Sequence, residues 1–477
     1  MVTVVSLGIE AGDLTKAGER AVLSAKKVLV RTALTRSYQN VTDLGVPHET
    51  LDRVYKTCRS FRSLHKKLAL EVKRAEREFG EVVYCVDGSA TEDNSVKELL
   101  KKRGKIQVIG GVSKSERFAS LARFSACSYA AASAYEAAEL AAGYSLPAPL
   151  VVYDLDDPAL AADLKILLSD KFGEETDALF IRGDQVKKIK LYELDRQKKY
   201  DYLTAVCVEK QDLLQKTRFS LSDLEEIIRR LRRPDGCPWD RAQTPDSVKM
   251  SAVEEAYELL DAVLSGDPDK IKEEAGDVMM QAVFHAVLQE ERGAFNLSDV
   301  LEGVCVKLIT RHTHVFGQDK ARSEADALSV WEKNKMTEKS QHTFSDAVND
   351  VPTCFPALLQ AQKIAKRLGK GGWETDGFTQ VKAELLTKLS ALENALSSGD
   401  KDGIKGALGG FLFVCACLCR AAGADGEEAL LEKLEKIKRL YTVYERMALE
   451  EGKDVNALTE EERALYLAKA KEAVKCC

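Results

Sequence analysis

The chain has 477 residues, of which 31% are charged and 45% are hydrophobic, and its formal net charge is −6. This length predicts two to three domains, since one domain typically spans about 100 to 200 residues. The near balance of charges gives no reason to expect a nucleic-acid polymer or a membrane as a partner. The basic run RRLRRP at 229–234 has no interleaved aromatic residues, so we interpret it as a solvated helix end.

Residues 1–212 alternate between runs typical of strands and runs typical of helices. The strand-like runs are VTVVSLG, KVLVRT, EVVYCVDG, KIQVIGG, LVVYDL and DALFIRG. Such alternation is typical of an α/β domain with a largely parallel sheet. We therefore predict an α/β domain over residues 1–212.

From about residue 215 onward, apolar residues recur at helical spacing, which predicts an all-α region. This region contains an internal repeat, because LSGDPDKIKEEAGDVMMQAV at 264–283 aligns with SSGDKDGIKGALGGFLFVCA at 397–416 after a shift of 133 residues. The repeat divides the region into two expected domains, 215–342 and 343–477.

Four carboxylates in the first copy are spaced so that a helical hairpin would bring them together. Glu255 and Glu258 are three residues apart, as are Glu274 and Asp277, so each pair shares one face of its helix. The turn-rich segment SGDPD separates the two helices. If the chain reverses near Gly266, each acid stands level with an acid on the other helix. The four side chains then form one acidic cluster.

Oxygen ligands without Cys or His suit a hard cation, so the cluster predicts Mg²⁺, with Mn²⁺ as an alternative, rather than zinc. In the second copy the four positions hold no acids; they are Lys388, Ala391, Ala407 and Gly410. Only the first copy is therefore a candidate metal site.

Several motifs of the all-α region occur in a characteristic order. They are GCPWDRAQT at 236–244, EEAYE at 254–258, EAGD at 274–277, KLITRHTHVFG at 307–317 and WEKNK at 331–335. Together they resemble the MazG family of nucleotide pyrophosphohydrolases. The resemblance implies an all-α, Mg²⁺-dependent enzyme that cleaves nucleoside triphosphates to monophosphates and pyrophosphate. It also implies that the metal is held by Glu255, Glu258, Glu274 and Asp277, with Glu254 as an additional acid.

This reading leads to further expectations for the reaction. A metal-activated water is expected to attack the α-phosphorus, with Glu254 or Glu255 as the group that accepts its proton. Lys307, Arg311 and Lys335 are candidates for contacts to the outer phosphates, because fixed cations stabilise charge on the departing group.

The GCPWDRAQT segment contains candidates for binding the nucleoside. Trp239 could stack on a base, or could instead be a packing anchor at a helix entrance. Asp240 and Gln243 could form hydrogen bonds with the edge of the base or with the ribose.

The N-terminal part resembles tetrapyrrole methylases through LGIEAGDLT at 7–15, VDGSATED at 86–93, GGVS at 110–113 and LYELDR at 191–196. The resemblance implies S-adenosylmethionine as a cofactor. The first loop of that family reads close to G-x-G-P-G-D, but Glu10 and Ala11 replace Gly and Pro here, and Asp87 stands where a Pro-Gly pair would begin. A bulky acid where a backbone must approach a cofactor closely argues against S-adenosylmethionine.

The expected fold is thus an N-terminal α/β, tetrapyrrole methylase-like domain followed by all-α MazG-like repeats. Because a helical hairpin needs other helices against its apolar side, a homodimer is also expected. Two alternatives stay open, namely an S-adenosylmethionine-dependent methyltransferase with a helical accessory region and a non-catalytic nucleotide sensor or scaffold.

Twelve scattered cysteines without a signal sequence favour reduced thiols in a cytoplasmic protein. The C-x-C-x-C run at 415–419 lacks the paired C-x-x-C spacing of zinc or iron–sulfur ligation. We interpret it as part of a core helix, because the charge-free stretch 406–419 is too short to span a bilayer.

Overall fold

The computed structural model describes residues 1–477 except 59–60, 125–127, 138–148, 339–342, 373–376 and 476–477. The described chain divides into two compact units, Met1–Leu297 and Ser298–Cys477. This division does not test the three expected domains, 1–212, 215–342 and 343–477, which stay a prediction.

The first unit begins with a five-stranded sheet in the order β3-β2-β4-β1-β5, in which every pairing is parallel. Its strands are β1 (Val2–Ser6), β2 (Val28–Val30), β3 (His48–Thr50), β4 (Val82–Val86) and β5 (Ile106–Ile109). The helices around it are α1 (Lys16–Leu23), α2 (Gln39–Thr42), α3 (Asp52–Tyr55), α4 (Phe61–Phe79) and α5 (Asn94–Leu100). Leu68 of α4 packs in a core with Val4 and Tyr84, and Val22 of α1 packs in a second core with Val5 and Cys85. Both faces of the sheet are therefore covered, as a parallel sheet requires.

A second sheet follows in the order β6-β7-β10-β8-β9. Its elements are β6 (Ala130–Ser133), β7 (Leu150–Tyr153), β8 (Asp177–Arg182), β9 (Gln185–Lys190) and β10 (Thr204–Val208), with helices α6 (Lys114–Ala122) and α8 (Pro158–Phe172). Only β6 and β7 are parallel, and the other pairings are antiparallel. The expectation of a largely parallel sheet is confirmed for the first sheet and is wrong for the second.

Four strands carry too weak a local pattern to be found in the sequence. β3 and β6 are only three and four residues long, with the sequences HET and AAAS. β9, QVKKIK, is an exposed edge strand rich in lysine, a composition that protects an edge from pairing with another chain. β10, TAVCV, is fully buried, and its short apolar run lacks the alternation of a half-buried strand.

The first unit ends in a series of helices. They are α9 (Leu221–Arg232), α10 (Pro238–Ala242), α11 (Pro245–Val248), α12 (Ser251–Ser265) and α13 (Pro268–Glu290). Of these, α9, α11 and α13 contribute to one apolar core. Ile228 of α9 and Val248 of α11 pack there with Phe284 and Val287 of α13. The apolar side of α13 is thereby buried, and its N-terminal half stays accessible.

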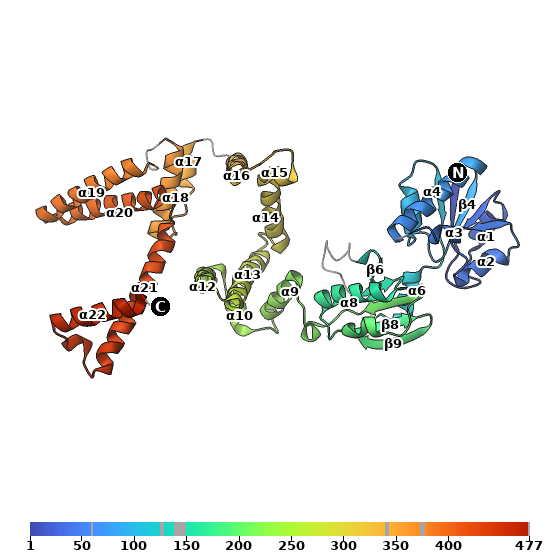
Figure 1. Ribbon diagram of the computed structural model, residues 1–477, viewed down its shortest axis with the longest axis horizontal. Coiled ribbons are helices and arrows are strands. Elements are labelled where there is room, and N and C mark those ends of the chain that lie inside the picture. Colours follow the sequence, from blue (N-terminus) through green and yellow to red (C-terminus); the bar gives the residue numbers. More distant parts are fainter. Residues whose placement is uncertain (59–60, 125–127, 138–148, 339–342, 373–376, 476–477) are drawn as a thin grey trace. The chain divides into compact units, whose positions relative to one another are not determined.

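The second unit is helical in its described residues. Its helices are α14 (Leu297–Arg311), α15 (Thr313–Phe316), α16 (Glu324–Glu338), α17 (Phe344–Asn349), α18 (Ala357–Lys370), α19 (Phe378–Ser398), α20 (Lys401–Ala421), α21 (Gly426–Glu450) and α22 (Glu460–Lys475). α19 and α20 form a hairpin, which Figure 1 draws in orange. Its helix boundaries are those of α12 and α13 shifted by 133 residues at the turn, since Ser398 corresponds to Ser265 and Lys401 to Pro268. The repeat seen in the sequence is thus a repeat of structure.

Helix α20 is the one described helix that is long and apolar enough to cross a membrane, with a mean hydropathy of 1.6, although core helices of soluble proteins also meet this criterion. Val414 and Cys417 belong to an apolar core with Ala365 and Val381, but only 17% of the apolar window is buried. The expectation of a core helix is therefore confirmed only in part. Cys417 is buried and Cys415 and Cys419 are half-buried. The cysteines in the described part of the chain are free thiols, as expected there.

Candidate metal centre

The turn between α12 and α13 is specified by three consecutive residues. Gly266 ends α12 with φ of 71°, a left-handed conformation that favours glycine. The side chain of Asp267 caps α13 by accepting a hydrogen bond from the Asp269 amide, and Pro268 occupies the first turn of that helix. The chain therefore reverses at Gly266, as the spacing predicts.

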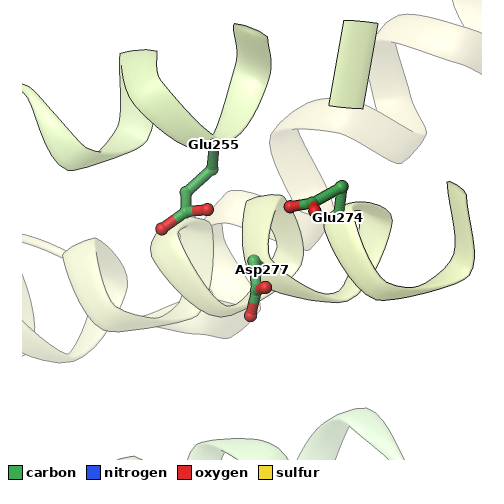
Figure 2. Close-up of side chains that lie close together, drawn as sticks. All are labelled: Glu255, Glu274 and Asp277. Carbon is green, nitrogen blue, oxygen red and sulfur yellow. The ribbon is translucent and has the colours of Figure 1, made fainter. Parts of the chain in front are cut away.

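The hairpin brings three of the predicted ligands together. One carboxylate oxygen from each of Glu255, Glu274 and Asp277 lies within 4.8 Å of the others. Figure 2 shows Glu255 reaching from α12 toward α13, which carries the other two acids. All three side chains are partly exposed, so an ion could reach them from solvent.

Electrostatic coupling between the helices follows the predicted register. Burial and then the charge of Asp277 raise the pKa of Glu255. Burial and then the charge of Glu258 raise the pKa of Glu274. These are the two pairs placed opposite each other by a reversal at Gly266. Crowded carboxylates with raised pKa values favour a bound cation, because the cation relieves their repulsion.

Two predicted acids lie outside the group of three. Glu258 is exposed, and its charge contributes to the raised pKa values of Glu255 and Glu274. Glu254 is also exposed on α12 and does not join the group. The role of Glu258 as a metal ligand and the role of Glu254 as the proton acceptor stay predictions.

Gln281 is a neighbour of the site that the motif analysis missed. Its Nε2 atom donates a long hydrogen bond of 3.5 Å to Glu255 Oε1. Gln281 follows Asp277 by four residues, which places it on the same face of α13. This four-residue spacing is the sequence signal that could have identified Gln281 as a neighbour of the acids. The side-chain amide lowers the pKa of Glu255, against the effects of burial and Asp277.

Arg232 anchors the GCPWDRAQT segment, which holds the nucleoside-binding candidates. Its side chain is 7% exposed, forms an ion pair of 2.7 Å with Glu291 directly after α13, and donates hydrogen bonds to the Asp240 and Gln243 carbonyls. The interpretation of RRLRRP as a solvated helix end is therefore wrong for this residue. Trp239 is 66% exposed on α10, so its ring is accessible.

The side chains of Asp240 and Gln243 differ in their local contacts. Gln243 donates from its amide to the Trp239 carbonyl and accepts from Ser247 Oγ. Asp240 is half-buried at the start of α10. Contacts of either side chain to a nucleoside stay predictions.

The candidate phosphate-binding residues belong to the second unit. Arg311 is 7% exposed, pairs in a bidentate manner with Glu338 at 2.7 and 2.9 Å, and lies over the Trp331 ring. Lys335 lies over the same ring at 5.0 Å, whereas Lys307 is exposed on α14. Arg311 is thus engaged inside the second unit, and phosphate contact by these residues stays a prediction.

The second hairpin does not repeat the acidic group. Lys388 of α19, at the position of Glu255, has its aliphatic chain near the backbone of Gly410, at the position of Asp277. The ammonium-bearing side chain of Lys388 therefore stands where the first hairpin has the carboxylate of Glu255. The corresponding α20 positions carry no carboxylate, so this hairpin offers no comparable ligand set for a metal.

The first loop of the N-terminal part is occupied by contacts of its own. The amides of Ile9 and Glu10 donate to Asp13 Oδ2, and the Gly12 amide donates to Asn40 Oδ1. Gly8 also forms an isolated bridge with Gly88. The amides that could cradle a cofactor therefore already have partners, which agrees with the argument against S-adenosylmethionine.

Comparison with known proteins gives a direct match to the hairpin and its surroundings. A family model described as the MazG nucleotide pyrophosphohydrolase domain matches residues 243–316. The nucleoside triphosphate pyrophosphohydrolase of Escherichia coli (strain K12) is 33% identical over 235 residues, which cover 49% of this chain and 89% of that protein. This chain belongs to the MazG family.

The MazG family model does not cover the N-terminal part, but two other similarities do. The uncharacterized protein YabN of Bacillus subtilis (strain 168) is 29% identical and covers 99% of this chain, with 98% of its own length matched. A solved uroporphyrin-III-C-methyltransferase from Thermus thermophilus covers 44% of this chain and 94% of its own, at 19% identity and a TM-score of 0.33. The similarity to YabN therefore extends over nearly the whole length of both chains.

Proposed function

We propose that the α12–α13 hairpin is the active site of a Mg²⁺-dependent hydrolase that converts nucleoside triphosphates to nucleoside monophosphates and pyrophosphate. The observation that carries this proposal is the convergence of Glu255, Glu274 and Asp277 within 4.8 Å. The group lies inside the matched MazG segment, and the relative from Escherichia coli bears the name of this activity.

The donor set fits a hard divalent cation, because it consists of carboxylates and contains neither Cys nor His. Glu255, Glu274 and Asp277 would hold the ion, with exposed Glu258 near enough to join them. When bound, a divalent ion polarises phosphate oxygens and lowers the pKa of bound water. Mg²⁺ is the first choice, and Mn²⁺ has the same ligand preference.

The protein's own residues would position and deprotonate the reactants. Glu255 is the better candidate for accepting a proton from the attacking water, because it belongs to the group and Glu254 does not. The exposed ring of Trp239 would stack on the base. The amide of Gln281 would hold Glu255 in place.

The alternatives receive less support from the residues. A methyltransferase would need an open cofactor loop, whereas the loop amides at Ile9, Glu10 and Gly12 are satisfied internally. A sensor would not require a group of carboxylates in which burial, and then the charges of neighbouring acids, raise the pKa values of Glu255 and Glu274. Catalysis explains why such a costly arrangement is present.

A product assay tests the proposal. The full-length protein is incubated with each common ribo- and deoxyribonucleoside triphosphate and Mg²⁺, and products are separated by chromatography. We expect monophosphate and pyrophosphate from the wild type and a rate lower by about 100-fold or more in Glu274→Gln, which corresponds to the loss of one ligand carboxylate. Glu273→Gln removes the adjacent, exposed charge and should keep the rate. Equal rates in both variants, or diphosphate as the product, would contradict the assignment.

We further propose a homodimer, because large apolar side chains are exposed on the functional helices. Val253, Tyr257 and Val263 are exposed on α12, and Leu308 and Ile309 are exposed on α14. A second copy of the same chain would cover these faces, since symmetric oligomers use the same surfaces on both subunits. Light scattering should then give about twice the chain mass of 52.6 kDa at micromolar concentration. A single-chain mass would refute the dimer. The cytoplasmic location and the absence of a nucleic-acid or membrane partner stay predictions.

A further inference from the structure

A cavity of about 240 Å³ lies in the first unit, away from the metal-binding hairpin. One side is formed by residues that follow β2 and β4, including Arg31 and Asp93, and the other by residues near the end of β7, including Tyr153 and Asp154. The two sides are linked by Lys114, whose Nζ atom lies 2.7 Å from Asp87 and 2.8 Å from Asp154. The cavity is therefore built from both sheets of the N-terminal part.

Three buried polar atoms of lining residues accept or donate no hydrogen bond within the described chain. They are Arg31 Nε, Asp93 Oδ2 and Asn94 Oδ1. Asp93 is 5% exposed, and its Oδ2 has an ion pair of 2.9 Å with Arg31 as its remaining contact. Buried polar groups in folded proteins are nearly always hydrogen-bonded, so these atoms indicate a missing partner. That partner would offer N–H donors to the two acceptors.

The lining carries more negative than positive charge. Five carboxylates face two permanent cations, an excess of three negative charges; the carboxylates are Asp87, Glu92, Asp93, Asp154 and Asp156, and the cations are Arg31 and Lys114. His65 does not offset this excess, since burial and the charge of Arg31 lower its pKa. Asp156 responds to the excess, because burial and the nearby Asp154 raise its pKa. A ligand with positive charge would balance the cavity.

Aromatic rings complete the lining. Tyr55, Tyr135, Tyr153 and Tyr202 all contribute to it. The ammonium of Lys114 already lies 5.9 Å from the centre of the Tyr202 ring. Tyrosine rings attract organic cations through their negative faces, and several rings together select such ligands.

The backbone of Asp154 is also unusual. Its φ of 59° is left-handed, one of two such values among the described residues other than glycine. Residues other than glycine rarely adopt this strained conformation, and it is concentrated at functional sites such as ligand-binding positions. It holds a carboxylate at the point where Lys114 bridges the two sides.

From these features we propose that the cavity binds a small organic cation, an aliphatic amine or guanidine, whose N–H groups pair with Asp93, Asn94 and Asp156 and whose charge lies against the tyrosine rings. Nothing in this proposal depends on the hydrolase reaction, because the cavity and the acidic hairpin share no residue.

Calorimetric titration of the full-length protein with agmatine, putrescine and spermidine tests the proposal. Agmatine should bind saturably, and Asp156→Asn should weaken its binding at least 10-fold. Asp184→Asn is the matched control, since it removes the same charge from an exposed residue outside the cavity and should leave binding unchanged. If Asp156→Asn alters the circular dichroism spectrum, Asn94→Ala takes its place and should weaken binding to a similar extent.

Three results would overturn the proposal. One is that none of the three amines binds. Another is that Asp156→Asn and Asp184→Asn bind agmatine equally, which would show attraction to the acidic surface alone. The third is that S-adenosylmethionine or S-adenosylhomocysteine binds while the amines do not, which would return the cavity to cofactor binding.

Discussion

Lys114 provides a sharp test of how the N-terminal part is held together. Its side chain is 6% exposed and bridges Asp87, also buried, to Asp154. Burial alone would raise the pKa of Asp87, but Lys114 and Arg31 hold it well below its usual range. Replacing Lys114 by Met keeps the length of the side chain and removes the charge. Two carboxylates then lose their shared cation.

The expected cost is about 3 to 5 kcal/mol, because breaking a buried ion pair leaves an uncompensated charge. Domains are typically stable by about 5 to 15 kcal/mol, so the variant should become marginal. The urea midpoint of the N-terminal part should fall by about 1 to 5 M, given a slope of about 1 to 3 kcal/mol per M.

Tryptophan fluorescence cannot report this change, since Trp239, Trp331 and Trp373 all lie outside residues 1–212. Amide hydrogen exchange in β1 and β4 measured across a urea series is the suitable assay. Lys97→Met is the matched control, because the Lys97–Glu136 pair is also 2.8 Å long but 40% and 32% exposed. An exposed pair contributes at most about 1 kcal/mol. If both variants shift the midpoint by the same small amount, the reasoning about buried charge is refuted.

Three further predictions concern the helical part. Mg²⁺ should stabilise the wild type by about 2.7 kcal/mol at 100 times its dissociation constant. Thermal scans should show that Asp277→Asn loses this gain and that Asp269→Asn, which changes an exposed acid on the same helix, keeps it. Equal gains in the two variants would argue against the site. In metal-free protein, burial and Asp277 raise the pKa of Glu255, so the folded state holds this proton more tightly and stability is lost as pH rises from the unfolded-state pKa of about 4.3 through the folded value. The wild type should therefore lose melting temperature relative to Glu255→Gln over that rise, and a constant difference would contradict the sign. Finally, Arg232→Ala should destabilise the helical core by about 2 kcal/mol or more and raise KM for the nucleotide, because a buried cation with several hydrogen bonds is lost. Arg230→Ala removes an exposed ion pair and should change stability by less than about 1 kcal/mol. Urea unfolding and steady-state kinetics distinguish the two variants.

The acidic hairpin could be predicted because its determinants are local. Spacing of three residues places acids on one helix face, and Gly266 marks the reversal through its need for a positive φ. The second sheet could not be predicted in the same way. β10 lies between β7 and β8, and that order depends on contacts between segments about 50 residues apart.

Residue types alone also failed to separate buried from exposed members of one motif. Arg230 and Arg232 lie in the same basic run, yet Arg232 is buried in its ion pair with Glu291 and Arg230 is exposed. Likewise α20 has the composition of a core helix, but most of its apolar window is not buried within this chain. Burial depends on which other elements reach a given face, and that is not encoded in the local pattern.

The sequence by itself determined the α/β and all-α halves, the repeat, the hairpin register and the family, because each follows from periodicity, short motifs or turn residues that act over a few positions. The tertiary structure alone decided which acids converge, how Gln281 and Arg232 contact the site region, and that a cavity with excess negative charge forms beside Lys114. These features arise where distant segments pack together, so their geometry and electrostatics exist only in the folded chain.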